Sequence, residues 1–340
     1  MSAKRAYGLK GPSAFAGGAE TPISYRVLEA LGKQRATHVP VPEIAVALSC
    51  RPDDVRCSVE AMRRLGYSVS ERPGEGIRLA TETDVIVRSR LQEGLGSRVL
   101  GRSLACFLEL DSTNALATRA ALTGAAHGTV VLAEHQKAGR GRLGRNWFSP
   151  PGVGLWFSLI LRYDLEVARA WMLTLGAAAA LADAVEASTG VCPDVRWPND
   201  LYLNDRKLAG ILTEVRGGDR GLDFAVLGIG INVNQEEADF PPGLQNTATS
   251  LRCGTGRTHD RTAMLAEALR ALEQVYAGLD AERIRKLWSG KARMLGNPVC
   301  IGTGSGPVRG VAEDLGTDGA LLVRGADGRV RRVLAGDVGV

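Results

Sequence analysis

The chain from residue 104 to about residue 279 alternates apolar, strand-like runs with segments of helical periodicity. This alternation constrains the fold strongly, because successive strands and helices must pack as layers around one core. It predicts an α/β domain with a mixed sheet. The expected strands are residues 105–110, 129–134, 155–161, 208–215 and 224–231. The expected helices are residues 113–122, 167–189 and 261–279.

The segment before this domain, residues 22–80, has the pattern helix, helix, turn, helix and hairpin. Its third helix begins at Pro52, which suits a first helical turn, and Val55, Val59 and Met62 fall on one face. Residues 67–70 and 77–79 are the expected strands of the hairpin. The pattern predicts a winged helix-turn-helix, although a small helical cap without a DNA role has the same order of elements. Residues 84–101 are expected to form a linking helix.

Beyond residue 288 the pattern changes to short strands punctuated by Gly and Asp, as expected for a small SH3-like β-barrel. The expected strands are residues 299–301, 307–313, 321–323 and 329–334. The chain is therefore expected to contain four parts: a disordered tail (1–20), a winged helix-turn-helix domain (21–82), a central α/β domain (83–290) and a C-terminal SH3-like domain (296–340).

Composition indicates an ordinary globular protein, with 45% apolar and 23% charged residues among 340. A formal net charge of +5 permits anionic substrates but is small for a dedicated nucleic-acid binder. The apolar run 170–187 is rich in alanine and is expected to be a buried helix, and no signal peptide is evident. The six cysteines show no Cys-x-x-Cys pair and are expected to be small buried hydrophobes. Together these features indicate a cytoplasmic protein.

The segment Gly139-Arg140-Gly141-Arg142-Leu143-Gly144-Arg145-Asn146-Trp147 alternates glycine with arginine and contains no acidic residue. Glycine allows backbone amides to approach a ligand closely, and each guanidinium offers planar donors to a carboxylate or phosphate. The segment therefore predicts a loop that closes over an anion. A flexible basic segment that contacts nucleic acid is the alternative.

No Ser-His-Asp or Cys-His arrangement can be assembled from the sequence, which argues against a nucleophile supplied by the protein. The four histidines have no evident partner and are expected to be structural or surface residues: His38, His127, His135 and His259.

Five segments in a fixed order resemble the biotin protein ligases, in particular their repressor-type members. They are Leu110-Asp111-Ser112-Thr113-Asn114, the Gly139 to Trp147 loop, Arg196-Trp197-Pro198-Asn199-Asp200-Leu201-Tyr202, Arg206-Lys207-Leu208-Ala209-Gly210-Ile211-Leu212 and Gly228-Ile229-Gly230-Ile231-Asn232. Lipoate and octanoyl transferases share the fold, but as a family they lack the Gly-Arg loop before a Trp and the Trp-Pro-Asn-Asp segment. The resemblance implies activation of biotin by ATP to biotinyl-5'-AMP, followed by transfer to a lysine of an acceptor such as the biotin carrier of acetyl-CoA carboxylase.

The resemblance also implies roles for particular residues. Lys207 and Arg140 would be catalytic, contacting the carboxylate and phosphate. The biotin-binding residues would be Ser112, Thr113, Asn114, Gln136, Gly139, Arg140, Gly141, Arg142 and Lys207. The ATP or adenylate would contact Arg142, Arg145, Trp147, Asn199, Asp200 and Asn232. Ser112 and Thr113 also fit an ordinary helix N-cap. Mg²⁺ is expected to arrive on the ATP phosphates, and its protein ligands are unknown.

The expected partners are the biotin acceptor, operator DNA of biotin-synthesis genes and a second copy of the chain in a ligand-induced dimer. Leu143 stands where repressor-type relatives often have another arginine, which leaves loop closure and dimerisation open. Two other functions remain open: a DNA-binding regulator that senses a ligand without transferring it, and a lipoate-type ligase. A catalytic Lys207 would distinguish a ligase from a pure sensor.

Overall fold

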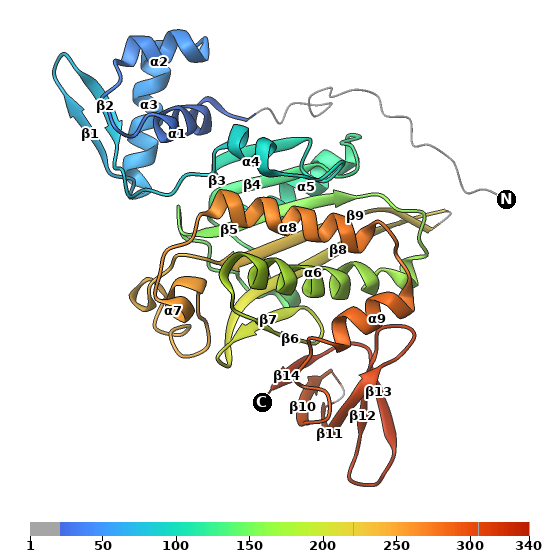
Figure 1. Cartoon of the computed structure of the whole chain (residues 1–340). Coiled ribbons are helices and arrows are strands. Elements are labelled where there is room, and N and C mark those ends of the chain that lie inside the picture. The colour runs from blue at the N-terminus through green and yellow to red at the C-terminus, as the bar shows by residue number, and fades with distance from the viewer. Residues whose placement is uncertain (1–20, 220, 305, 340) are drawn as a thin grey trace.

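The structure is a computed structural model, and it describes residues 21–219, 221–304 and 306–339. The tail expected at residues 1–20 lies outside the described residues. Figure 1 shows three parts: N-terminal helices with a hairpin, a large sheet covered by helices, and a small β domain at the C-terminal end. The α/β core with a mixed sheet and the C-terminal β domain confirm the predicted fold class at this level.

The N-terminal part contains the expected three helices and hairpin. Its elements are α1 (Ile23–Lys33), α2 (Val41–Leu48), α3 (Pro52–Arg64), β1 (Val69–Arg72) and β2 (Gly76–Leu79). Pro52 stands at the start of α3, and the Asp54 carboxylate accepts from the Arg51 amide at 3.0 Å. Tyr25, Val55 and Met62 are fully buried where α1 and α3 meet.

The linking helix expected at residues 84–101 is wrong over most of its length, because only α4 (Arg88–Gly94) is helical. Three consecutive residues before it, Val85, Ile86 and Val87, are buried and lie outside the helix, and Val87 has an extended backbone. Branching at the β-carbon disfavours helix, and burial keeps this segment against the core. At the other end Gly96 adopts φ +58°, which favours glycine and ends the helical path.

The central sheet has seven strands in the order β3-β4-β5-β9-β8-β7-β6. Its strands are β3 (Leu104–Leu110), β4 (Val130–Gln136), β5 (Gly154–Leu161), β6 (Asp194–Arg196), β7 (Asp200–Leu203), β8 (Arg206–Gly218) and β9 (Gly221–Asn232). β3 and β4 are parallel and the other neighbours are antiparallel, so the sheet is mixed. The five predicted strands are present, and the short strands β6 and β7 were missed.

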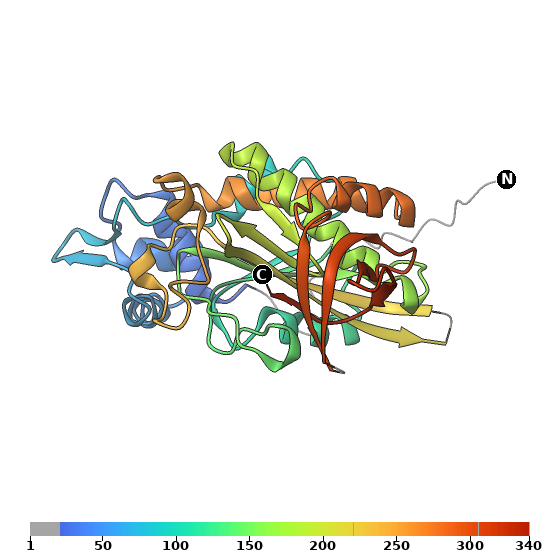
Figure 2. The same ribbon diagram turned by 90° about the horizontal axis from the view of Figure 1, so that it is seen from below.

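Helices cover both faces of this sheet (Figure 2). α5 (Thr113–Leu122) packs on β4, β5 and β9 on one face. α6 (Trp171–Thr189) packs on β8 on the other face, and α8 (Arg261–Tyr276) packs against α6. The side chains of β3 alternate accordingly, since Phe107 joins the α5 cluster and Leu108 joins the larger core. Two short helices were not predicted, α7 (Leu251–Thr255) and α9 (Ala281–Ser289).

The alanine-rich helix lies inside the molecule. The stretch Val167–Thr189 is long and apolar enough to cross a membrane, but 67% of its most apolar window is buried in the protein. Gly176 allows close packing, because a Cβ there would lie 3.1 Å from both Val275 and Ile284. The hydroxyl of Tyr276 donates to the carbonyl of Leu173. These contacts are those of a core helix, as the composition predicts.

The C-terminal part is a five-stranded antiparallel sheet in the order β13-β12-β11-β10-β14. Its strands are β10 (Pro298–Thr303), β11 (Gly306–Leu315), β12 (Leu321–Arg324), β13 (Val330–Val333) and β14 (Asp337–Gly339). The last strand was not predicted. Gly319 anchors this part to the core, because its carbonyl accepts from Trp197 Nε1 and a Cβ there would lie 2.6 Å from the Trp171 ring.

Two expectations about single residue types need correction. The expectation that the cysteines are buried is wrong for Cys57 and Cys192, which are exposed, and Cys106 alone among the six is fully buried. The histidines do have partners: His38 and His135 lie beside Glu75 and Glu109, His127 accepts from the Arg162 amide, and His259 bonds Thr255. These partners come from distant segments or surface turns, so spacing along the chain could not show them.

Candidate functional site

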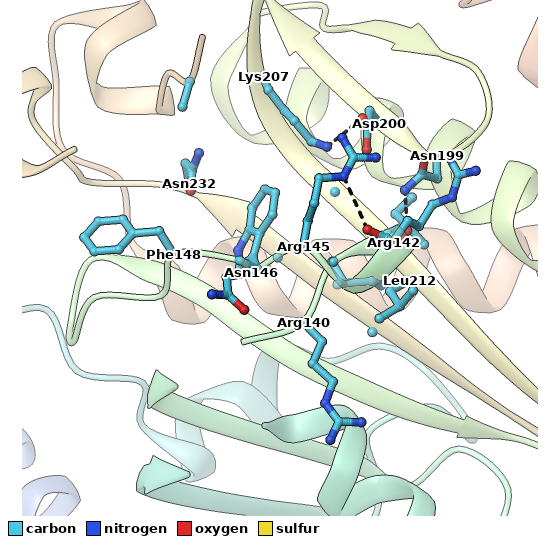
Figure 3. Close-up of a pocket in the computed structure, with 18 of the residues that line it drawn as sticks. Arg140, Arg142, Arg145, Asn146, Phe148, Asn199, Asp200, Lys207, Leu212 and Asn232 are labelled. Atoms are coloured by element: carbon cyan, nitrogen blue, oxygen red, sulfur yellow. Dashed lines mark hydrogen bonds and ion pairs between the residues drawn. The ribbon is translucent and has the colours of Figure 1, made fainter. Parts of the chain in front are cut away.

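A pocket of about 250 Å³ opens beside the ends of β7, β8 and β9, next to the loop between β4 and β5 (Figure 3). Of the predicted site residues, all except Gly139 line it: Ser112, Thr113, Asn114, Gln136, Arg140, Gly141, Arg142, Arg145, Trp147, Asn199, Asp200, Lys207 and Asn232. These residues come from five separate segments, and the fold brings them together around one cavity.

The glycine–arginine loop is folded back on itself. The Gly141 amide donates to the Arg145 carbonyl at 2.7 Å, and Arg140 pairs with Asn146 as an isolated bridge. Between them Leu143 has a positive φ of 56° and its side chain is exposed. Gly139 does not line the pocket; its carbonyl accepts from the Trp147 amide at 2.9 Å, and a Cβ at this position would lie 2.4 Å from the Trp147 carbonyl.

Arg142 fixes the loop to two other parts of the protein. Its guanidinium donates to Asn199 Oδ1 at 2.9 Å and to the Gly336 carbonyl at 3.3 Å. Asn199 lies in the turn between β6 and β7, and Gly336 precedes β14 in the C-terminal sheet. One side chain therefore ties the loop to the edge of the main sheet and to the C-terminal part.

Lys207 is the second residue of β8, and its ammonium donates to Asp200 Oδ2 at 2.6 Å. The two side chains are 29% and 19% exposed, so the pair faces the pocket and is not sealed. Arg145 lies beside this pair, whereas Arg140 points away from it (Figure 3). Among the lining residues in the described part of the chain, four side chains are cationic and Asp200 is the single carboxylate.

Trp147 lies flat on two glycines of the sheet. Gly210 of β8 and Gly230 of β9 are paired across the strands, and a Cβ at either would lie 2.9 or 2.3 Å from the indole ring. The ring centre is 5.5 Å from Lys207 Nζ. Because only glycine permits this approach, Gly210 and Gly230 make room for the indole against the sheet.

The start of α5 forms the polar wall of the pocket. Ser112 caps the helix by accepting from the Ala115 amide, as the N-cap interpretation predicts. Thr113 donates to Gln136 Oε1 from both its amide and its hydroxyl, at 2.9 and 3.1 Å. Ser112, Thr113 and Asn114 are each only 4% exposed. The wall is therefore held by hydrogen bonds among its own side chains.

Two of the asparagines that line the pocket, Asn199 and Asn232, are buried and their side-chain amides bond to the protein. Asn199 donates to the Ile211 carbonyl at 2.7 Å and accepts from Arg142. Asn232 donates to the Thr249 carbonyl at 2.9 Å and accepts from Gln235 at 3.1 Å. Both side chains are thus fixed in orientation at the edge of the cavity.

Several lining residues were missed from the sequence. The segment after β9 contributes Phe240, Leu244, Thr247 and Ala248. It reaches the pocket because Lys207 donates its amide to the Thr247 carbonyl, at 2.7 Å, and accepts from the Thr249 amide, at 3.0 Å. No local motif marks this segment. Gly228 and Gly230, in contrast, belong to the Gly228 to Asn232 motif and could have been assigned to the pocket from the sequence.

Metal coordination by the protein has little support in this geometry. Across residues 21–219, 221–304 and 306–339, no group of three or more His, Cys, Asp or Glu side chains is placed to hold a metal ion. Asp200, the pocket carboxylate, is bound to Lys207.

Comparison with known proteins gives a consistent set of relatives. Residues 105–232 match the biotin/lipoate A/B protein ligase family, and residues 294–339 match the biotin protein ligase C-terminal domain. The chain is 34% identical over 299 residues to the bifunctional ligase/repressor BirA of Bacillus spizizenii, covering 87% of this chain and 92% of that protein. It is 36% identical to the biotin–[acetyl-CoA-carboxylase] ligase of Paracoccus denitrificans, over 64% of this chain and 93% of that protein.

A solved structure is also similar. The biotin protein ligase of Aquifex aeolicus in complex with biotin and ATP superposes with a TM-score of 0.59 at 30% identity. The match covers 70% of this chain and 98% of that chain.

Proposed function

This chain belongs to the biotin protein ligase family, and from that premise we propose that its pocket joins biotin to ATP and passes the product to an acceptor lysine. One oxygen of the biotin carboxylate attacks the α-phosphorus of ATP, and pyrophosphate leaves. The ε-amine of the acceptor lysine then attacks the carbonyl carbon of biotinyl-5'-AMP, and AMP leaves. Each step gathers negative charge, so fixed cations and amide donors are needed more than a nucleophile.

The observation that carries this proposal is the charge of the pocket, which is lined by four cationic side chains and one carboxylate. A carboxylate and a triphosphate repel each other until cations lie between them. Lys207 is the cation best placed to bridge them, because its ammonium reaches the pocket floor beside Trp147. We propose that the reacting oxygens replace Asp200 as partners of Lys207, while Arg145 neutralises the phosphates from the loop.

The remaining contacts with biotin and the adenylate are assigned from where each residue lies in the pocket. Ser112, Thr113, Asn114 and Gln136 form the polar wall that would receive the biotin ring, with Arg140 and Gly141 at the loop above it. Trp147, Asn199 and Asn232 would surround the adenylate, and Arg142 would hold the loop closed through Asn199 and Gly336. Mg²⁺ would arrive on ATP and shield the phosphates.

The experiment is ATP-dependent transfer of radiolabelled biotin to a biotin-acceptor domain, with lipoate offered in parallel. Label in the acceptor with biotin and none with lipoate is the expected result. Label from lipoate would favour the lipoate-type alternative. Binding of biotin without transfer would favour a sensor that does not act as a ligase. The acceptor expected from the named relatives is a carrier of the acetyl-CoA carboxylase type.

We further propose that the N-terminal part is a winged helix-turn-helix that binds operator DNA in a ligand-induced dimer. The order α1, α2, α3 and hairpin supports it. So does the match to the Bacillus ligase/repressor: residues 83–340 make up about three quarters of the chain, so coverage of 87% includes part of the N-terminal helices. The domain limits 21–82, 83–290 and 296–340, and the SH3-like class of the last, remain proposals on the same basis.

A further inference from the structure

Ser158 of β5 lies beneath the polar wall of the pocket and is completely buried. Its hydroxyl oxygen is 2.8 Å from Thr113 Oγ1 and 2.6 Å from Asn114 Oδ1. The opposite residue on β9 is Gly228, where a Cβ would lie 2.0 Å from Asn114 Oδ1. The Ser158 hydroxyl therefore lies opposite a glycine, Gly228, whose lack of a side chain leaves room for Asn114. Because the hydroxyl is buried in an apolar sheet, it requires defined hydrogen-bond partners.

The amide of Asn114 sets the direction of these hydrogen bonds. Its Nδ2 lies 2.8 Å from Glu214 Oε2 and 3.4 Å from the Leu212 carbonyl. A carboxylate and a carbonyl can only accept, so the amide nitrogen faces them and Oδ1 faces Ser158. A hydroxyl carries a single proton, and Asn114 Oδ1 can only accept. The proton of Ser158 is therefore donated to Asn114.

Thr113 is left with accepting capacity toward the pocket. The hydroxyl proton of Thr113 has two acceptors within the protein, Gln136 Oε1 at 3.1 Å and Ser158 Oγ at 2.8 Å. Gln136 cannot turn to donate, because Oε1 also accepts the Thr113 amide and Nε2 donates to Ser149 Oγ at 2.9 Å. Within the described part of the chain, no remaining group donates to Thr113 Oγ1. Its lone pair therefore suits a ligand N–H.

We propose that Ser158 is a positioning residue of this site, because its proton, committed to Asn114, makes Thr113 an acceptor for a ring N–H of biotin. The inference rests on the proposed function. Glu214 stands at the far end of the same chain of hydrogen bonds and fixes the Asn114 amide. Neither Ser158 nor Glu214 lines the pocket, so each acts on the ligand only through Thr113 and Asn114.

The test is a double-mutant cycle with pyrophosphate release as the readout. Ser158→Ala removes the hydroxyl that holds Thr113 Oγ1, so the Thr113 lone pair is no longer fixed toward the pocket and the KM for biotin rises about tenfold. The KM for ATP stays within about twofold, because the nucleotide contacts other residues. In a Thr113→Val background, Ser158→Ala changes the KM for biotin by less than about twofold, since the acceptor is already gone.

Two further variants keep the test decisive. Ser97→Ala makes the same change at a buried serine that bonds the Leu100 carbonyl outside the pocket, and it leaves both KM values unchanged. If Ser158→Ala does not fold, Glu214→Ala at a half-buried site gives the same pattern, with a KM for biotin about threefold higher. Equal effects of Ser158→Ala in both backgrounds, or a parallel rise in the KM for ATP, overturn the inference. A wild-type protein that releases no pyrophosphate with biotin overturns the proposed function and the inference with it.

Discussion

Charged side chains meet in two regions of this molecule, and burial separates their roles. At the junction of the N-terminal part with the main sheet, Arg261 is fully buried. It donates to Asp84 Oδ2, Glu134 Oε2 and the Gly154 carbonyl, each at 2.9 Å. Tyr67 also donates to Glu134, at 3.1 Å. We call Tyr67, Asp84, Glu134 and Arg261 the junction cluster.

In the pocket the chemistry is the same but the setting differs. Lys207 pairs with Asp200 at 2.6 Å, yet both side chains remain partly exposed and more cations than carboxylates line the cavity. Burial opposes the charge on Arg261, but Glu134 and Asp84 outweigh it and raise the pKa of the guanidinium. The Arg261–Glu134 pair is thus closed to solvent, since both side chains are fully buried, whereas the Lys207–Asp200 pair is open to the pocket. The closed pair belongs to the folded core, whereas under the proposed function the open pair exchanges its carboxylate for a substrate anion.

The largest expected effect comes from breaking the junction cluster. Arg261→Met leaves Glu134, which is fully buried, without its cation. We expect the free energy of unfolding to fall by roughly 3–5 kcal/mol, measured by urea denaturation. Arg90→Met is the matched control, because Arg90 pairs with Asp260 at the surface and should cost less than about 1 kcal/mol. Equal losses in the two variants would contradict the contrast between the regions.

Removing Lys207 should have the opposite effect: a large loss of activity and little loss of stability. Lys207→Ala should lower biotin-dependent pyrophosphate release by about 10²–10³-fold, because the cation nearest the developing charge is lost. The free energy of unfolding should change by less than about 1 kcal/mol, since the Lys207–Asp200 pair is partly solvated.

The adjacent residue provides the control for this prediction. Arg206→Ala removes a cation that pairs with Glu237 outside the pocket, and it should leave the rate unchanged. Release by Lys207→Ala within about threefold of wild type would remove Lys207 from the proposed mechanism.

The sequence predicted those parts of the fold whose pattern is local. α5 begins and ends at the predicted residues, because a capping serine precedes it and a helical run follows. β6 and β7 have three and four residues, too few to show a period. The linking helix failed because burial of Val85 and Ile86 against distant segments overrides what the local pattern favours.

The same distinction holds for the site. Residues inside contiguous motifs, such as Arg142 and Lys207, were assigned, and the fold brings them to one pocket. Ser158 and Glu214 stand singly in apolar strands, and only strand register reveals their neighbours. Thr247 reaches the pocket through backbone pairing with Lys207 across some forty residues, a contact that no local spacing encodes. What was missed is therefore long-range in origin.

The smallest expected effect concerns the N-terminal part. Its arginines are neither buried like Arg261 nor placed in a pocket like Lys207. On α3 and the hairpin, arginines pair with nearby carboxylates at the surface: Arg51 with Asp54, Arg56 with Glu71, Arg63 with Glu60 and Glu71, and Arg72 with Glu75. DNA phosphates must compete with these carboxylates. We therefore expect weak binding by a monomer, steep salt dependence, and useful affinity only when ligand-induced dimerisation adds a second copy.

Fluorescence anisotropy with DNA from upstream of the host's biotin-synthesis genes, with and without biotin and ATP at low salt, measures this. Glu71→Gln removes the carboxylate shared by Arg56 and Arg63, so it should raise affinity about threefold and steepen the slope of log K against log salt by roughly one. Glu82→Gln is the matched control, since Glu82 contacts Thr81 and no arginine in the described part of the chain, and it should leave the slope unchanged. Binding that biotin and ATP do not enhance would make this domain an interaction module and leave the ligase proposal intact. A slope unaffected by Glu71→Gln would show that α3 does not face the phosphates.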